Sequence, residues 1–163
     1  MAWETKNNQL VFTISTKNIG HTPATNVTTS ANALVDKVNT QNSKLPAFVK
    51  EAFQFAAARA GLDNSGETLF PDEKFEPQWR ITLNKPDIDA AVSKFNGRDA
   101  ISVYLVVTVN YRFGSGKGQT ARIVDVMARN PQTGSLQLID PNSDVPPAGP
   151  WGLNNLPVGE QTF

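Results

Sequence analysis

The chain has 163 residues, no cysteine, and 15 Lys and Arg against 15 Asp and Glu. This length favours one domain, with enough buried surface for a core that needs neither disulfides nor a structural metal. The absence of cysteine excludes thiol chemistry and Cys-ligated zinc, and the balanced charge argues against a nucleic-acid partner. No apolar run approaches the roughly 18 residues that span a bilayer.

The first predicted strand runs from residue 10 to residue 15. Its apolar side chains fall at every second position and are Leu10, Phe12 and Ile14. A period of two is typical of a β-strand that buries one face. A second strand, rich in Thr and Val, is expected over 24–34.

A corner with the sequence Asn-Ile-Gly-His-Thr-Pro-Ala-Thr-Asn-Val, over 18–27, joins these two strands. Gly20 can adopt a positive φ, Asn18 can hydrogen-bond to nearby backbone, and Pro23 removes a donor that a central strand would need. His21, the only histidine, is either the centre of a binding loop or an exposed turn residue. We favour the turn, because a single histidine lacks the neighbouring ligands of a metal site.

An α-helix is predicted over 46–60, because Pro46 suits a first helical turn and Gly61 suits the position after the last. Apolar residues recur at helical spacing: Phe48, Val49, Ala52, Phe53, Ala56 and Ala60. The phenylalanines of this segment either bind a lipid or a partner or pack on a sheet, and we favour packing. Phe55 lies away from the main stripe, so it is the aromatic side chain expected to contact a partner.

A third strand is predicted over 78–83, and a short helix over 87–95. Acidic residues in the first turn of this helix complement its dipole. Asp87 and Asp89 lie two residues apart and do not share a helix face. A pair of carboxylates for acid–base catalysis is therefore not expected there.

The clearest strand signal is the unbroken alternation over 101–113. A glycine-rich segment follows at 114–118, then a return strand over 121–129 and a short edge strand over 135–139. The glycines superficially resemble a phosphate-binding loop, but the segment lacks the Lys-Ser/Thr pair and joins two strands. We therefore predict a hairpin tip with a solvated Lys117, and we expect no cofactor.

From residue 141 the composition changes to Asp, Asn, Gly and Pro, without hydrophobic periodicity. We interpret 1–140 as one domain and 141–163 as a Pro/Gly-rich tail. The tail is either a linker or an extended arm that docks a partner. Within it, Trp151 is expected to fold back on the domain or to contact the partner.

The corner also resembles a motif of a known family. Residues 18–27 are similar to the pattern N-x-G-x-x-P-A-x-N-V of immunoglobulin-like domains in bacterial envelope proteins, many of unknown function. Residues 69–73 and 102–113 correspond to two later parts of that pattern, although Asp72, Val106 and Phe113 replace its Gly, Gly and Asp. The family domain often follows N-terminal membrane helices, so the resemblance implies a membrane anchor that is absent from this chain.

Together these patterns predict a mainly β fold, an antiparallel immunoglobulin-like β-sandwich with an inserted α-helix at about 46–60 and a short helix at about 87–95. The resemblance implies an extracytoplasmic, membrane-tethered location in the cell envelope, with a cytoplasmic location as the alternative. We expect a non-catalytic module that binds a protein partner through its inserted helix, an exposed sheet edge or its tail. The candidate partner-binding residues are His21, Phe55 and Trp151.

Two other functions stay open. One is a small-molecule or carbohydrate-binding module that uses exposed aromatic residues: Trp3, Trp79, Trp151, Tyr104 and Tyr111. The other is a structural subunit with a large symmetric interface. No catalytic residue is proposed, because no serine lies in a nucleophile-elbow motif that the one histidine could serve. No metal-binding residue is proposed, because no cluster of metal ligands lies near that histidine in the sequence.

Overall fold

The computed structural model describes residues 2–4, 8–38, 43–62, 66–130, 132–142 and 151–156. In these ranges the fold is mainly β, with antiparallel sheets and two helices, as the sequence predicts. The larger sheet has the order β12-β11-β10-β4-β5, and β13 also pairs with β11. Its strands are β4 (Ala24–Asp36), β5 (Glu67–Leu69), β10 (Ser102–Phe113), β11 (Gly116–Arg129), β12 (Leu136–Gln137) and β13 (Trp151–Leu156).

The smaller sheet has three antiparallel strands in the order β1-β2-β7. These strands are β1 (Ala2–Glu4), β2 (Gln9–Thr13) and β7 (Gln78–Thr82). Two short ribbons complete the β structure: β3 (Thr16–Lys17) with β6 (Lys74–Phe75), and β8 (Ser93–Phe95) with β9 (Arg98–Ala100). The helices are α1 (Leu45–Leu62) and α2 (Lys85–Ala91).

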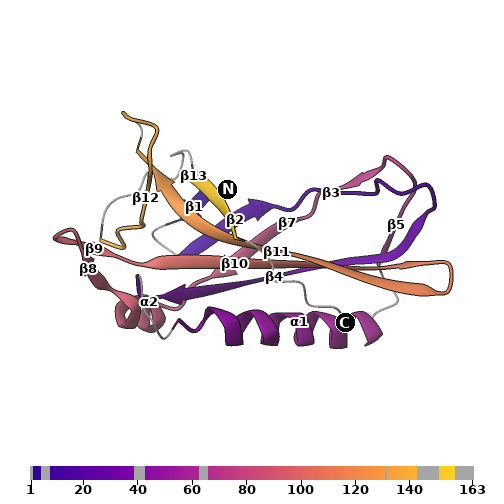
Figure 1. Ribbon diagram of the computed structural model, residues 1–163, viewed down its shortest axis with the longest axis horizontal. Helices are drawn as coiled ribbons and strands as arrows, with labels where there is room; N and C mark the ends of the chain where they lie inside the picture. Colours follow the sequence, from indigo (N-terminus) through magenta and orange to yellow (C-terminus); the bar gives the residue numbers. More distant parts are fainter. Residues whose placement is uncertain are drawn as a thin grey trace.

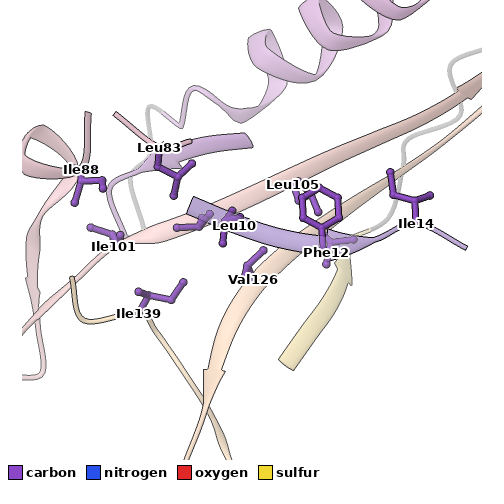
Figure 2. Close-up of a cluster of buried hydrophobic side chains, with 12 residues drawn as sticks. Leu10, Phe12, Ile14, Leu83, Ile88, Ile101, Leu105, Val126 and Ile139 are labelled. Atoms are coloured by element: carbon purple, nitrogen blue, oxygen red, sulfur yellow. The ribbon is translucent and has the colours of Figure 1, made fainter. Parts of the chain in front are cut away.

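The main hydrophobic core lies between the two sheets (Figure 2). It buries alternate residues of the first and the longest predicted strands, which confirms that both have a buried face. The buried members from the strands are Leu10, Phe12, Val103, Leu105, Val124 and Val126. Because β-branched and large apolar side chains fill a pleated surface well, this pattern specifies which face of β10 and β11 is covered by the smaller sheet.

Helix α1 lies along the larger sheet on the side away from β2 and β7 (Figure 1). Its Val49, Ala52 and Phe53 pack against Val106 of β10 and Ile123 of β11. The second face of β10, which alternation alone would leave in solvent, is therefore buried beneath a helix, and Val106 is 0% exposed. The sheet is thus covered on both sides along its middle.

Several polar residues of the larger sheet are buried with their hydrogen bonds made. The hydroxyls of Ser30 and Thr108 lie 2.6 Å apart, and both residues are buried. The Asn110 side-chain amide donates to the carbonyl oxygen of Ala56 in α1, at 3.3 Å. These bonds offset the cost of removing polar groups from water.

The β10–β11 hairpin is confirmed, but its turn is shorter than the glycine-rich segment suggests. Only Gly114 and Ser115 form the turn, and β11 starts at Gly116. A Cβ on Gly118 would lie 2.5 Å from the ring of Tyr111. That glycine therefore serves close packing of an aromatic ring on the strand rather than a bend.

The prediction of a short helix over 87–95 is wrong at the C-terminal end. Helix α2 stops at Ala91, and residues 93–95, expected to be helical, form strand β8. Asn96 and Gly97 have φ values of 50° and 78° and join β8 to β9. Two positive φ values in a two-residue loop favour a hairpin, and this local signal decides the structure here.

Farther on, residues 151–156 of the expected tail form β13, antiparallel to β11.

Candidate functional site

The outer edge of β4 is the feature of this fold best suited to binding. Strand β4 pairs with β10 on one side, from Thr25 to Asp36. On its other side β5 pairs with it only at Ala24 and Val27. In the part of the chain that the structure describes, no strand pairs with β4 beyond Val27 on that side. Residues 28–36 therefore present outward backbone N–H and C=O groups at alternate positions.

A cavity of about 500 Å³ lies beside one end of this edge. Residues 33–36 of β4 line it, and so does Lys37, which follows the strand. Phe48 from the start of α1 lines it as well, and so do Leu83, which follows β7, and Ala90 of α2. Because four consecutive β4 residues line the cavity, it borders both the backbone edge and the side chains of the strand.

A second cavity, of about 280 Å³, lies farther along the same edge. Residues 27–30 of β4 line it, together with Ala56 of α1 and Phe75 and Trp79 from the side of the smaller sheet. At both cavities the strand edge thus lies between α1 and the β7 side of the molecule. We call this recess, which follows residues 27–36 of β4 and the adjoining Lys37, the β4 groove.

Asp36 fixes the helix wall of the β4 groove. Its carboxylate accepts hydrogen bonds from the backbone N–H of Lys37 at 2.9 Å and from the backbone N–H of Lys44 at 2.8 Å. The Ser43 hydroxyl donates to the same carboxylate at 3.2 Å. An acceptor at this position satisfies N–H groups ahead of the first turn of α1, so the end of β4 and the start of the helix are held together.

Two buried donors near the β4 groove lack an acceptor. The indole Nε1 of Trp79 and the side-chain Nδ2 of Asn32 are both buried, with no hydrogen-bond partner among the described residues. Trp79 lines the smaller cavity, and Asn32 lies in β4 between the residues that line the two cavities. A buried donor without an acceptor costs about 1–3 kcal/mol, so each is a place where an added carbonyl oxygen would be favourable.

The structure does not bring the three predicted site residues together. His21 is exposed in the corner, and Phe55 is 55% exposed on α1. Trp151 begins β13 opposite Ala128, while Thr25, within the corner that holds His21, lies opposite Arg112 at the other end of the long strands. The side chain of Trp151 lies outside the described residues.

The described aromatic residues do not form a flat binding platform. Trp79 and Tyr111 are half-buried and pack against the core clusters. The rings of Tyr111 and Phe113 have centroids 6.1 Å apart but are tilted by 39°. Tyr104 is half-buried, and the side chain of Trp3 is outside the described residues.

In the described ranges, no cluster of three or more His, Cys, Asp or Glu side chains could hold a metal ion. Asp125 is half-buried in β11, and burial raises the pKa of its carboxyl above the ordinary value. Its Oδ1 has no hydrogen-bond partner within the described structure. A raised pKa of this kind makes the contribution of the carboxyl to stability depend on pH.

The sequence did not indicate the β4 groove. The Thr- and Ala-rich pattern of β4 predicts a strand, but the length of its pairing with β5 depends on where a distant segment ends.

None of the described helices is long and apolar enough to cross a membrane. Comparisons of the chain with protein-family models, curated proteins and solved structures find no match.

Proposed function

We propose that this protein is a non-catalytic interaction module that binds an extended peptide segment of a protein partner in the β4 groove. The observation that carries the proposal is the outer edge of β4 over 28–36, which has no described strand partner and is flanked by two cavities. In strand addition, backbone hydrogen bonds supply affinity and pockets for alternate side chains supply selectivity.

The walls of the β4 groove define the kind of peptide that it suits. Side chains of an added strand alternate between the α1 side, with Phe48 and Ala56, and the β7 side, with Leu83 and Trp79. Both walls are largely apolar at these positions, so the preferred peptide has apolar residues facing them. A carbonyl oxygen of the peptide is a suitable acceptor for the unpaired N–H of Trp79.

The recessed position of the edge supports a flexible segment as the partner rather than a second folded copy. Pairing two copies edge to edge would require the β4 edge of each to reach past the other's helix α1. A single extended chain needs only the width of one strand, about 4.8 Å in the direction of hydrogen bonding. The partner is therefore expected to supply a loop or a terminal segment.

A displayed library of random ten-residue peptides, selected against the immobilised protein, tests the proposal. Selected peptides should lose at least tenfold in affinity when alternate backbone nitrogens are methylated, because each lost hydrogen bond is worth about 1 kcal/mol. The Ala90→Arg variant places a long side chain at the larger cavity and should weaken binding. Ala58→Arg, on an exposed helical alanine outside both cavities, is the matched control.

Peptides that tolerate backbone methylation, or that bind the Ala90→Arg and Ala58→Arg variants equally well, would contradict strand addition at β4. Circular dichroism of both variants checks that neither result reflects unfolding.

We also propose that the two antiparallel sheets form an immunoglobulin-like β-sandwich and that the domain is extracytoplasmic in a bacterial cell envelope. The resemblance of residues 18–27 to the family motif supports both. Because the chain has no cysteine, a Lys117→Cys variant tests the location with a membrane-impermeant maleimide. Labelling of intact cells is expected, whereas labelling only after lysis would place the domain in the cytoplasm.

A further inference from the structure

A separate cavity of about 650 Å³ lies at the corner of the fold and shares only Val27 with the described lining of the β4 groove. We call it the corner pocket. One wall is the segment from the end of β2 through the corner, and the other is the face of the β10–β11 hairpin beyond the smaller sheet. Its apolar lining includes Ile14, Val27, Leu69, Val107, Val109 and Tyr111. A volume of this size and an apolar lining are typical of sites for small ligands.

Asn18 makes the corner wall rigid. Its side-chain amide donates to the carbonyl oxygens of Thr22 and Leu69, both at 2.9 Å, and its Oδ1 accepts from the Gly20 N–H at 2.9 Å. The Asn18 carbonyl accepts from the Asp72 N–H at 2.8 Å. One residue thus ties the corner to the turn after β5. A wall fixed in this way is formed before binding, which lowers the entropy cost of taking up a ligand.

The charged groups at the corner pocket have one sign. Lys17 and Arg122 line it, and no Asp or Glu is among its described lining residues. The Lys17 ammonium lies 2.7 Å from the Asp72 carboxylate, so its charge is already paired. Arg122 forms no ion pair with any described residue and is exposed on β11. Its guanidinium is therefore available for an anion, and its forked donors match a carboxylate.

We propose that the corner pocket binds an apolar molecule with a single anionic head group, of the class of medium-chain carboxylates. The carboxylate pairs with Arg122 at the rim, and the hydrocarbon chain lies against the valines of β10. Exposed apolar side chains at the rim, Ile19 at 86% and Phe113 at 47%, extend the apolar surface that the chain can cover. This binding does not depend on the peptide function proposed for the β4 groove.

Isothermal titration calorimetry with three probes of equal chain length tests this inference: decanoate, 1-decanol and decyltrimethylammonium. Decanoate is expected to bind, decanol to bind about tenfold more weakly, as a charge-assisted hydrogen bond requires, and the cation not to bind. Arg122→Gln should remove the preference for decanoate over decanol. Arg80→Gln, at an exposed arginine of β7 outside the pocket, should not.

Thr120 provides a second, steric test because it is exposed and lines the corner pocket, so its substitution is compatible with folding. Thr120→Trp should weaken decanoate and decanol alike by filling the cavity. Equal binding of all three probes, no binding of decanoate, or decanoate binding unchanged in both the Arg122→Gln and Thr120→Trp variants would overturn the proposal.

Discussion

The carboxylate of Asp36, at the end of β4, accepts a hydrogen bond from the backbone N–H of Lys44, 2.8 Å away at the start of α1. This contact joins β4, whose outer edge is open, to α1, which forms one wall of the β4 groove. The β4 groove therefore has a rigid entrance rather than one formed only on binding. Asp36 is 6% exposed, so the link is shielded from solvent.

Asp36→Ala should lower the free energy of unfolding by about 2 kcal/mol, because it removes the charged acceptor of two part-buried backbone N–H groups, those of Lys37 and Lys44. Asp36→Asn should lower it less, since the amide oxygen can still accept. Urea denaturation followed by circular dichroism measures both values. Asp89→Ala, which removes only an exposed ion pair with Lys85, is the control and should stay within about 0.5 kcal/mol of the wild type.

Because Ser30 and Thr108 share a hydrogen bond, substitutions at these two positions should have coupled effects on the free energy of unfolding. Ser30→Ala should cost about 1–2 kcal/mol, because the Thr108 hydroxyl stays buried without that partner. Adding Thr108→Val should cost little more, since both polar groups are then gone. A double-mutant cycle from urea denaturation measures the coupling. Strictly additive effects would show that the bond contributes nothing to stability.

Gly118 should not tolerate a side chain. Gly118→Ala would place a Cβ 2.5 Å from the Tyr111 ring, and moving that ring should cost about 1–3 kcal/mol. The neighbouring exposed Lys117→Ala is the control and should be nearly neutral. Thermal unfolding checks both. A Gly118→Ala protein as stable as the wild type would mean that Tyr111 does not pack on this strand.

Asp125 predicts a pH dependence of stability. Burial raises the pKa of its carboxyl in the folded state, so as the pH rises above the ordinary value of an aspartate the unfolded chain loses its proton first. The folded state binds more protons in that window, and this group's contribution to stability falls until the pH passes the raised pKa. Above that pH the penalty is constant.

Asp125→Asn removes this penalty and should be more stable than the wild type at pH 7, with a smaller difference at pH 4. Denaturation series at several pH values give the comparison, and the exposed Asp89→Asn is the control. A difference that grows as the pH is lowered would have the wrong sign for a raised pKa.

The sequence predicts those strands and helices in which the spacing of apolar residues matches the face that is buried. The alternation over 101–113 is found as β10, and Pro46 with the apolar spacing after it predicts α1 to within about two residues of its observed bounds. The apolar stripe of α1 alone could not reveal that the helix covers the second face of β10. That choice depends on Val106 and Ile123, which pair across the β10–β11 hairpin and lie far from α1 in the sequence.

Elements set by local turns or by distant pairing were harder to predict. Asn96 and Gly97 end the helical segment early because their positive φ values form a hairpin, and the acidic first turn before them gave no sign of it. Strand β13 lacks periodicity and owes its conformation to pairing with β11. The open edge of β4 follows from the short length of β5, which no pattern within β4 records.

Amide hydrogen exchange across residues 28–36 of the free protein tests the central claim most directly. An open edge predicts an alternating pattern: amides bonded to β10 exchange slowly, and the residues between them exchange quickly because their N–H groups face water. Adding a selected peptide should slow the fast set alone. Uniform slow exchange over the whole stretch in the free protein would mean that the edge is already covered and would contradict binding by strand addition.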